Sequence, residues 1–102
     1  MATQKITVYW RDIPAQVIIK RGRARGKAEL GRRFQEGIDR AAMRAGRGSS
    51  DAYMSDWRRE STAVEATGDL TELARLEAAR LEASYDDERL AQLVANNGLA
   101  ED

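Results

Sequence analysis

Residues 4–11 alternate apolar and polar side chains, and this alternation limits the possible folds more than any other feature of the chain. Ile6, Val8 and Trp10 fall on one side of an extended backbone, and polar or amphipathic residues fall on the other. A period of two built from β-branched and aromatic residues predicts a β-strand. The chain therefore begins with a strand that has one apolar face.

A second strand is predicted directly after the first. Pro14 suits the second position of a tight turn that starts at Ile13. Residues 15–21 then place Val17 and Ile19 on one face. Because so short a connection leaves no room for a crossover, we expect the two strands to pair antiparallel.

A glycine- and arginine-rich break over residues 22–26 is predicted to be a loop, followed by a helix over residues 27–45. Apolar residues recur there at spacings of three and four, which is typical of an amphipathic helix. Gly31 and Gly37 inside this helix suggest close packing against the sheet. Gly46 is a plausible C-terminal cap that opens a loop over residues 46–50.

Residues 52–64 allow two interpretations. The alternation of side chains fits a charged edge strand, and a short helix over residues 54–60 is the alternative. Beyond this segment, Asp69 is expected to cap one helix, and Ser84 or Asp86 is expected to cap a second that ends near residue 96.

The predicted order is β-β-α-β-α-α. This predicts an α+β fold of two layers, with a three-stranded, mainly antiparallel sheet and C-terminal helices. If the third strand pairs beside the first, the first becomes central. We expect residues 1–66 to form the β-β-α-β domain, and residues 67–102 to form an acidic helical extension packed on it.

The composition excludes several kinds of chemistry. The 102 residues include no Cys and no His. Thiolate or imidazole metal sites, Cys nucleophiles and Ser-His-Asp triads are therefore excluded. We predict no catalytic residues, no metal and no cofactor, and favour a non-enzymatic role. The first ten residues lack the apolar region of a signal peptide, and no apolar run is long enough for a membrane span. We therefore expect a cytoplasmic protein.

Charge is divided between the two parts of the chain. Residues 1–60 carry fourteen Lys or Arg against seven Asp or Glu, whereas residues 61–102 carry three against ten. The densest basic stretch lies within residues 20–33. Cations beside a helix start favour an anion such as a phosphate or a nucleic-acid backbone. The alternative is a solvated turn paired with the acidic helices. The candidate anion-binding residues are Arg21, Arg23, Arg25 and Lys27.

A second candidate site lies near the hairpin and the third strand. Exposed aromatic residues beside Arg suit a protein interface or nucleobase stacking. Trp10 shares a face with Ile6 and Val8 and is expected in the core. The candidate partner-binding residues are Tyr9, Arg11, Asp12 and Trp57.

Three segments together resemble a known family. They are TVYWRDIPAQV over residues 7–17, FQEGIDRAA over residues 34–42, and the pair Tyr53 and Trp57. They resemble the small bacterial "virulence factor" domain family over about residues 4–64. The resemblance implies a short cytoplasmic protein or a part of a larger one. It also implies an accessory role near folate and corrinoid one-carbon methyl-transfer enzymes. It carries over no catalytic residue.

Three functions therefore stand as hypotheses. The first is an accessory module that binds a protein partner, with Arg23, Arg25 and Lys27 providing electrostatic steering. The second is binding of nucleic acid or a phosphorylated ligand through residues 20–33. The third is an accessory subunit in folate or corrinoid one-carbon methyl transfer. The sequence leaves open whether the chain is a monomer or a homodimer.

Overall fold

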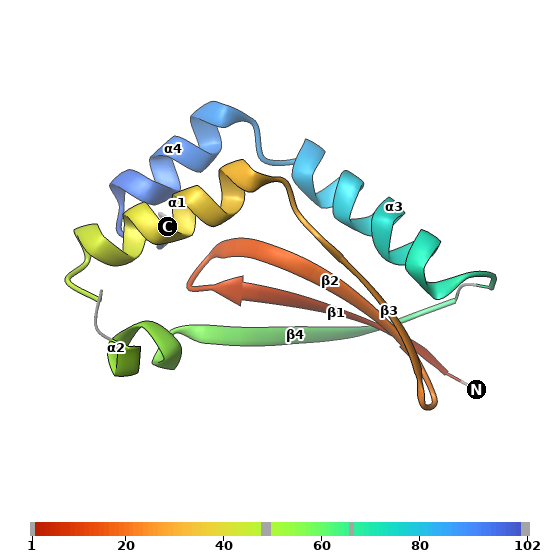
Figure 1. Cartoon of the computed structure of the whole chain (residues 1–102). Coiled ribbons are helices and arrows are strands. Elements are labelled where there is room, and N and C mark those ends of the chain that lie inside the picture. Colours follow the sequence, from red (N-terminus) through yellow and green to blue (C-terminus); the bar gives the residue numbers. More distant parts are fainter. Residues whose placement is uncertain (1, 48–49, 66, 101–102) are drawn as a thin grey trace.

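A computed structural model describes residues 2–47, 50–65 and 67–100. It confirms the α+β class and corrects the number of strands, because the sheet has four strands in the order β3-β2-β1-β4. The longer helices lie on one side of this sheet, whereas the short helix that precedes the edge strand lies at the end of that strand (Figure 1). The predicted boundary at residue 66 lies outside the described residues, and the division into two parts stays a prediction.

The central strands are the two predicted from the start of the chain. β1 (Thr3–Trp10) and β2 (Ile13–Arg21) pair antiparallel, as expected. The turn between them lies at Arg11 and Asp12, so the prediction of a turn around Pro14 was wrong. Pro14 already belongs to β2 and pairs with Tyr9, next to a register shift. Such a bulge lets a strand hold a residue that has no backbone N–H to donate.

The third strand of the chain replaces the predicted loop and the predicted helix start. β3 (Ala24–Glu29) pairs antiparallel with β2 after a turn at Gly22, where φ is +61°. Its alternation is between cations and small residues, so it lacks the large apolar side chains that usually reveal a strand. Gly26 explains why small residues are needed. A Cβ there would lie 2.6 Å from the carbonyl oxygen of Leu70.

The first helix, α1 (Arg32–Arg44), is five residues shorter at its start than predicted. Its buried side includes Phe34 and Ile38, which are 1% and 0% exposed. Gly46 follows it with φ of +72°, in agreement with the predicted cap. Gly37 does mark a close approach, but to a helix rather than to the sheet. A Cβ there would meet Val94 at 3.3 Å.

The edge-strand interpretation of residues 52–64 holds for residues 57–64, whereas the alternative helix over residues 54–60 is wrong, because the helix here ends at Ser55. α2 (Ser50–Ser55) is a short helix, and β4 (Trp57–Val64) is an edge strand. β4 pairs antiparallel with β1, which confirms the predicted pairing of these two segments. Within the predicted loop over residues 46–50, residues 48 and 49 lie outside the described residues.

The last two helices cover the sheet and the first helix. α3 (Leu70–Ala83) packs on β2 and β3, and α4 (Asp87–Ala95) packs on α1. The Asp69 carboxylate accepts hydrogen bonds from the first turn of α3, and Asp86 accepts one from Arg89 N. The cap at Asp69 was predicted, and of the two candidates for the second helix, Ser84 and Asp86, it is Asp86 that caps it. Within the described residues, none of the helices has the length and apolar composition that crossing a bilayer requires.

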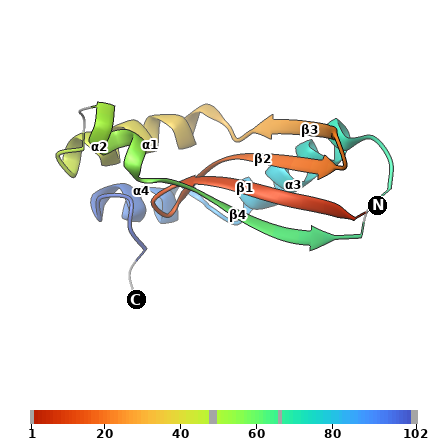
Figure 2. The ribbon, with the colours of Figure 1, turned by 90° about the horizontal axis from the view of Figure 1, so that it is seen from below.

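The core lies between the helices and the sheet. Trp10 is fully buried there, as expected, and its Nε1 donates a hydrogen bond to the carbonyl oxygen of Tyr53 at 2.9 Å. The opposite side of the sheet has no such layer, because no helix lies in front of the strands when the molecule is seen from below (Figure 2).

Candidate functional site

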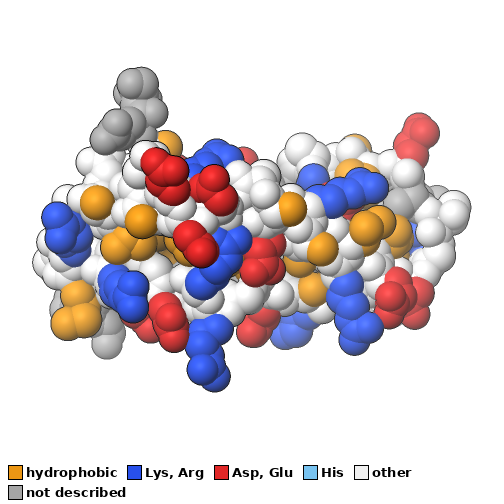
Figure 3. Space-filling model, turned by 90° about the horizontal axis from the view of Figure 1, so that it is seen from above, with side chains coloured by type: hydrophobic (Ala, Val, Ile, Leu, Met, Phe, Trp, Pro, Cys, Tyr) orange, Lys and Arg blue, Asp and Glu red, His pale blue; other side chains and the backbone are white. Residues whose placement is uncertain are grey.

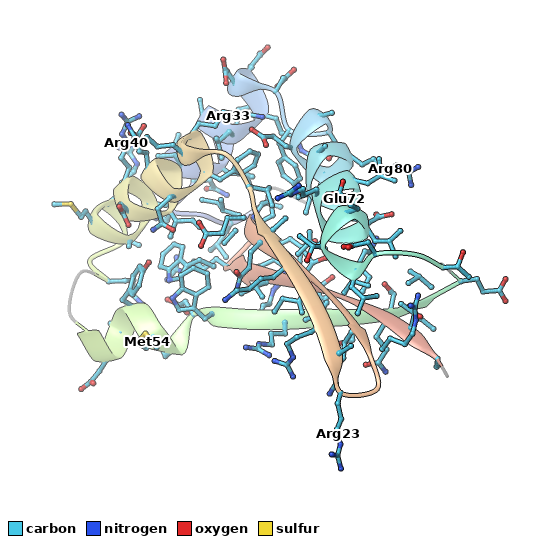
Figure 4. All side chains as sticks on the ribbon, turned by 45° about the vertical axis from the view of Figure 1, so that its right-hand side comes forward. Arg23, Arg33, Arg40, Met54, Glu72 and Arg80 are labelled. Atoms are coloured by element: carbon cyan, nitrogen blue, oxygen red, sulfur yellow. The ribbon has the colours of Figure 1, made fainter. Side chains whose placement is uncertain are left out.

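The predicted anion-binding residues do not form one cluster. Arg21 lies on the helix side of the sheet, where its Nε donates to Thr3 Oγ1 at 3.0 Å. Arg23 extends away from the tip of the β2–β3 turn (Figure 4). Arg25 and Lys27 are exposed on the opposite side of the sheet from Gly26. The helix begins only at residue 32, so the predicted helix start beside Lys27 is wrong.

The predicted partner-binding residues are divided as well. Tyr9 and Asp12 lie together at one end of the sheet and line the same cavity. Trp57 lines a different hollow, together with Val8 and Met54. The structure thus separates Trp57 from the other aromatic candidate, although both belong to neighbouring strands.

Arg11 is held inside a network of its own. It sits in the turn with φ of +53°, a conformation that favours glycine. Its Nε lies 3.3 Å from Asp56 Oδ2, and its Nη1 donates to the carbonyl oxygen of Asn97 at 2.9 Å. These contacts fasten the hairpin turn to the segments beside it, so the geometry gives Arg11 a structural position.

Asp56 is the centre of this network. Arg47 Nε lies 2.9 Å from the same Oδ2 that Arg11 contacts. The hydrogen bond from Arg47 lowers the pKa of Asp56 below its ordinary value, and the charges of Arg11 and Arg47 add to this effect despite partial burial. Asp56 therefore stays ionised at neutral pH and holds two cations together.

Tyr9 and Arg58 are paired by stacking. The Arg58 guanidinium carbon lies 4.4 Å from the centre of the Tyr9 ring. Burial raises the pKa of Tyr9 above its ordinary value, and the nearby Tyr85 and Glu60 raise it further. At neutral pH Tyr9 is therefore a neutral phenol that can donate a hydrogen bond.

The side of the sheet without helices, here called the open face, is defined by the strand register. Residues directly opposite each other on paired strands share a face of the sheet. Gly26 and Lys5 face α3, so the residues next to them along each strand point to the other side of the sheet. The open face consists of Gln4, Ile6, Val8, Gln16, Ile18, Lys20, Arg25, Lys27, Glu29, Arg59, Ser61 and Ala63.

Positive charge predominates on the open face. It carries four cations, Lys20, Arg25, Lys27 and Arg59, and one acidic residue, Glu29. None of the four cations forms an ion pair or a side-chain hydrogen bond with any residue that the structure describes. On the helix side, by contrast, basic and acidic side chains are interleaved (Figure 3).

The centre of the open face is apolar. Val8 and Ile18 are 8% and 5% exposed, although no helix covers them. At one end a shallow hollow of about 350 Å³ lies between Val8, Met54 and Trp57. Met54 is 64% exposed, and Trp57 packs edge-on against Tyr53 with 5.8 Å between the ring centres. The open face thus combines an apolar centre, an aromatic end and a basic surround.

Sequence reasoning missed Arg59 as a site residue. The signal was present, because the alternation over residues 52–64 placed Arg59 on the same side as Trp57. Its neighbours on the face come from β2 and β3, and only the sheet order brings them together. Within the described part of the chain, no group of three or more carboxylates is arranged to hold a metal ion.

Comparison with known families agrees with the motifs of the first two strands and the first helix. The chain matches the family described as "Virulence factor" over residues 8–94 and belongs to this family. The match extends past residue 64, through α3 and most of α4, so it covers more of the chain than the motifs indicated. The comparison with curated proteins found no match, and neither did the comparison with solved structures. An accessory role in one-carbon methyl transfer stays a prediction.

Proposed function

We propose that this chain is a protein-binding module that docks an acidic surface of a partner protein on its open face. The observation that carries this proposal is a set of four cations that form no ion pair with any described residue. They surround an apolar centre on a sheet face without a helix layer. The role is that of an accessory protein rather than an enzyme.

Charge complementarity selects an acidic partner. Lys5, Arg33 and Arg58 on the helix side are each within 4 Å of a carboxylate, so their charge is largely compensated. The cations of the open face lack such compensation from described residues. Uncompensated charge of one sign speeds the encounter with an oppositely charged surface and disfavours partners of the same sign.

The apolar part of the face supplies the short-range contact. Met, Trp and Arg are enriched in protein interfaces, and Met54, Trp57 and Arg59 lie together at one end of this face. Four strands about 4.8 Å apart and about 25 Å long present roughly 400 Å². This is about half the area that each partner buries in a stable complex, so we expect a weak and transient association.

The same cations would attract a nucleic acid, but the apolar residues favour a protein. Ile6, Val8 and Ile18 at the centre of the face are aliphatic. Nucleobases bind to sheet surfaces largely by stacking on aromatic rings, and the centre offers none. Trp57 is half-buried at the edge, where one side of its ring meets Tyr53.

The test uses photo-cross-linking from the centre of the face. A photoreactive amino acid at Ser61, which is exposed and pairs with Ile6, is expected to capture a protein with an acidic surface in native lysate. The same group at Ala79, exposed on α3, is expected to capture none of it. Capture should resist nuclease treatment. Loss of the product after nuclease treatment would instead indicate nucleic-acid binding and contradict the proposal.

Charge reversal provides the matched control. Lys27→Glu with Arg59→Glu should abolish capture from Ser61, because it removes half of the cations of the face. Arg32→Glu with Arg40→Glu changes the net charge equally on the exposed side of α1 and should leave capture intact. Equal capture by both double variants would overturn the proposal.

A further inference from the structure

A second candidate site lies on the other side of the sheet from the open face. A cavity of about 390 Å³ opens between the ends of β1 and β4, helix α4 and the segment that follows α4. Its polar wall includes Tyr9, Arg58, Tyr85 and Arg89. This volume lies at the lower end of the range of small-molecule sites.

We propose that this cavity binds a small molecule that carries one carboxylate on an apolar body. The proposal is independent of the open face and of any protein partner. It rests on three features of the cavity wall. Two phenol hydroxyls have no hydrogen-bond partner among the described residues, one cation has no carboxylate partner among them, and a patch of aliphatic side chains lies opposite.

The two phenols are held in place by stacked guanidinium groups. Arg58 lies over the ring of Tyr9, and Arg89 lies over the ring of Tyr85 with 4.0 Å between its guanidinium carbon and the ring centre. Neither hydroxyl has a hydrogen-bond partner among the residues that the structure describes. Both hydroxyls can therefore donate to an acceptor in the cavity. Burial raises the pKa of Tyr9, which favours its neutral, donating form.

Arg89 is the cation of the cavity wall that is available to an anionic group. Arg58 contacts Asp12 at 3.1 Å and Glu60 at 3.0 Å, so its charge is compensated. Arg89 donates to the carbonyl oxygen of Ser84 at 2.7 Å and has no carboxylate partner in the described part of the chain. One open guanidinium edge matches the planar, two-oxygen geometry of a carboxylate. A phosphate dianion would leave a negative charge without a partner.

The remaining wall favours an apolar body. Leu93 from α4, together with Leu99 and Ala100 after it, lines the cavity opposite the tyrosines. Leu99 is 46% exposed, so part of its apolar surface faces water. Covering this surface is favourable, and a hydrocarbon or aromatic body attached to the carboxylate would do so.

The test compares three defined probes by two-dimensional ¹H–¹⁵N NMR titration. We expect 3-phenylpropanoate to shift the amide signals of Arg89, Leu93 and Leu99. The neutral alcohol 3-phenylpropanol should bind about tenfold more weakly or worse, because it lacks the charge-assisted hydrogen bonds. Inorganic phosphate should cause no shift at these amides. Equal binding of the alcohol, equal binding of phosphate, or no shift with any probe would overturn the inference.

Two variants of cavity residues test whether 3-phenylpropanoate binds in this cavity. Tyr85→Phe keeps the ring that packs against Phe34 and removes the hydroxyl, and Arg89→Gln removes the charge. Each should weaken 3-phenylpropanoate binding about tenfold. Arg75→Gln, on the exposed side of α3, is the matched control and should bind as the parent chain does. The dispersion of the NMR signals without ligand shows whether each variant is folded. Unchanged binding by both folded cavity variants would contradict the assignment.

Discussion

Arg58 Nη2 lies 3.1 Å from Asp12 Oδ1 and joins the hairpin turn to the edge strand β4. The second oxygen of the same carboxylate, Asp12 Oδ2, accepts a hydrogen bond from the backbone N–H of Ala100 at 2.6 Å. The Asp12 side chain in the turn therefore holds both β4, through Arg58, and the C-terminal segment, through Ala100. These are also the segments that enclose the cavity beside Tyr9.

Asp12→Asn should loosen the C-terminal segment. The amide is uncharged, so the bonds to Arg58 and to Ala100 both weaken, and we expect a loss of about 1 kcal/mol from the free energy of unfolding. Hydrogen exchange at the Ala100 amide should become faster. Glu60→Gln, which removes only the more exposed ion pair of Arg58, is the control and should leave this exchange rate unchanged.

Gly26→Ala should destabilise the fold through a backbone clash. A Cβ at residue 26 would lie 2.6 Å from the Leu70 carbonyl oxygen, and backbone atoms cannot move aside as a side-chain end can. Separating α3 from β3 would cost about 1–3 kcal/mol in urea unfolding. Lys27→Ala, on the next residue but on the open face, should change stability by less than about 0.5 kcal/mol. Equal effects would show that α3 does not pack this closely.

Protonation of Asp56 should lower the stability of the folded chain in acid. Its pKa is lowered in the folded state by the hydrogen bond from Arg47 and by the charges of both arginines. Its stabilising contribution is therefore fully present above the pKa of the unfolded chain, near 4, and is lost as the pH falls through the lower folded pKa.

Urea unfolding between pH 7 and pH 2 measures this contribution. Asp56→Asn should be less stable than the parent chain at pH 7 and should show a smaller fall in stability with acid. Asp51→Asn, whose carboxylate forms no ion pair among the described residues, is the matched control. A parent-like pH profile for Asp56→Asn would contradict the proposed role of the Arg11–Asp56–Arg47 network.

The two capping aspartates should stabilise their helices separately. Asp69 Oδ1 accepts hydrogen bonds from Thr71 N at 2.8 Å and Glu72 N at 3.1 Å. Asp69→Ala should therefore cost about 1 kcal/mol by thermal or urea unfolding, and Asp86→Ala should cost a similar amount at α4. Asp69→Asn retains a capping oxygen and should recover most of the loss. If Asn gave no recovery, the effect of Asp69 would not come from capping.

Part of the fold was predictable because its causes are local. The alternation of Ile6, Val8 and Trp10 and the short connection to the next strand predict an antiparallel pair, and the structure confirms it. The capping residues Asp69 and Asp86 act within one helical turn, so their spacing in the sequence already locates the helix starts. Trp10 is buried as expected, but Ile6 and Val8, whose face it shares in the sequence pattern, lie on the open face.

The rest depended on contacts between distant residues. β3 was missed because its small side chains at Gly26 and Ala28 have a purpose only where α3 lies over them. The grouping of Arg59 with Lys27 needs the order of all four strands.

The sequence by itself determined the antiparallel hairpin, the cap at Asp69 and the buried side of α1, because neighbouring residues suffice for each. It did not determine that the apolar side of β1 at Ile6 and Val8 would lie on the open face. Only the tertiary structure decided which cations meet on the open face, and that Tyr9 and Trp57 line different cavities. The physical reason is that a strand fixes which side a residue faces, whereas its neighbours on that side come from other strands and helices, brought together by packing.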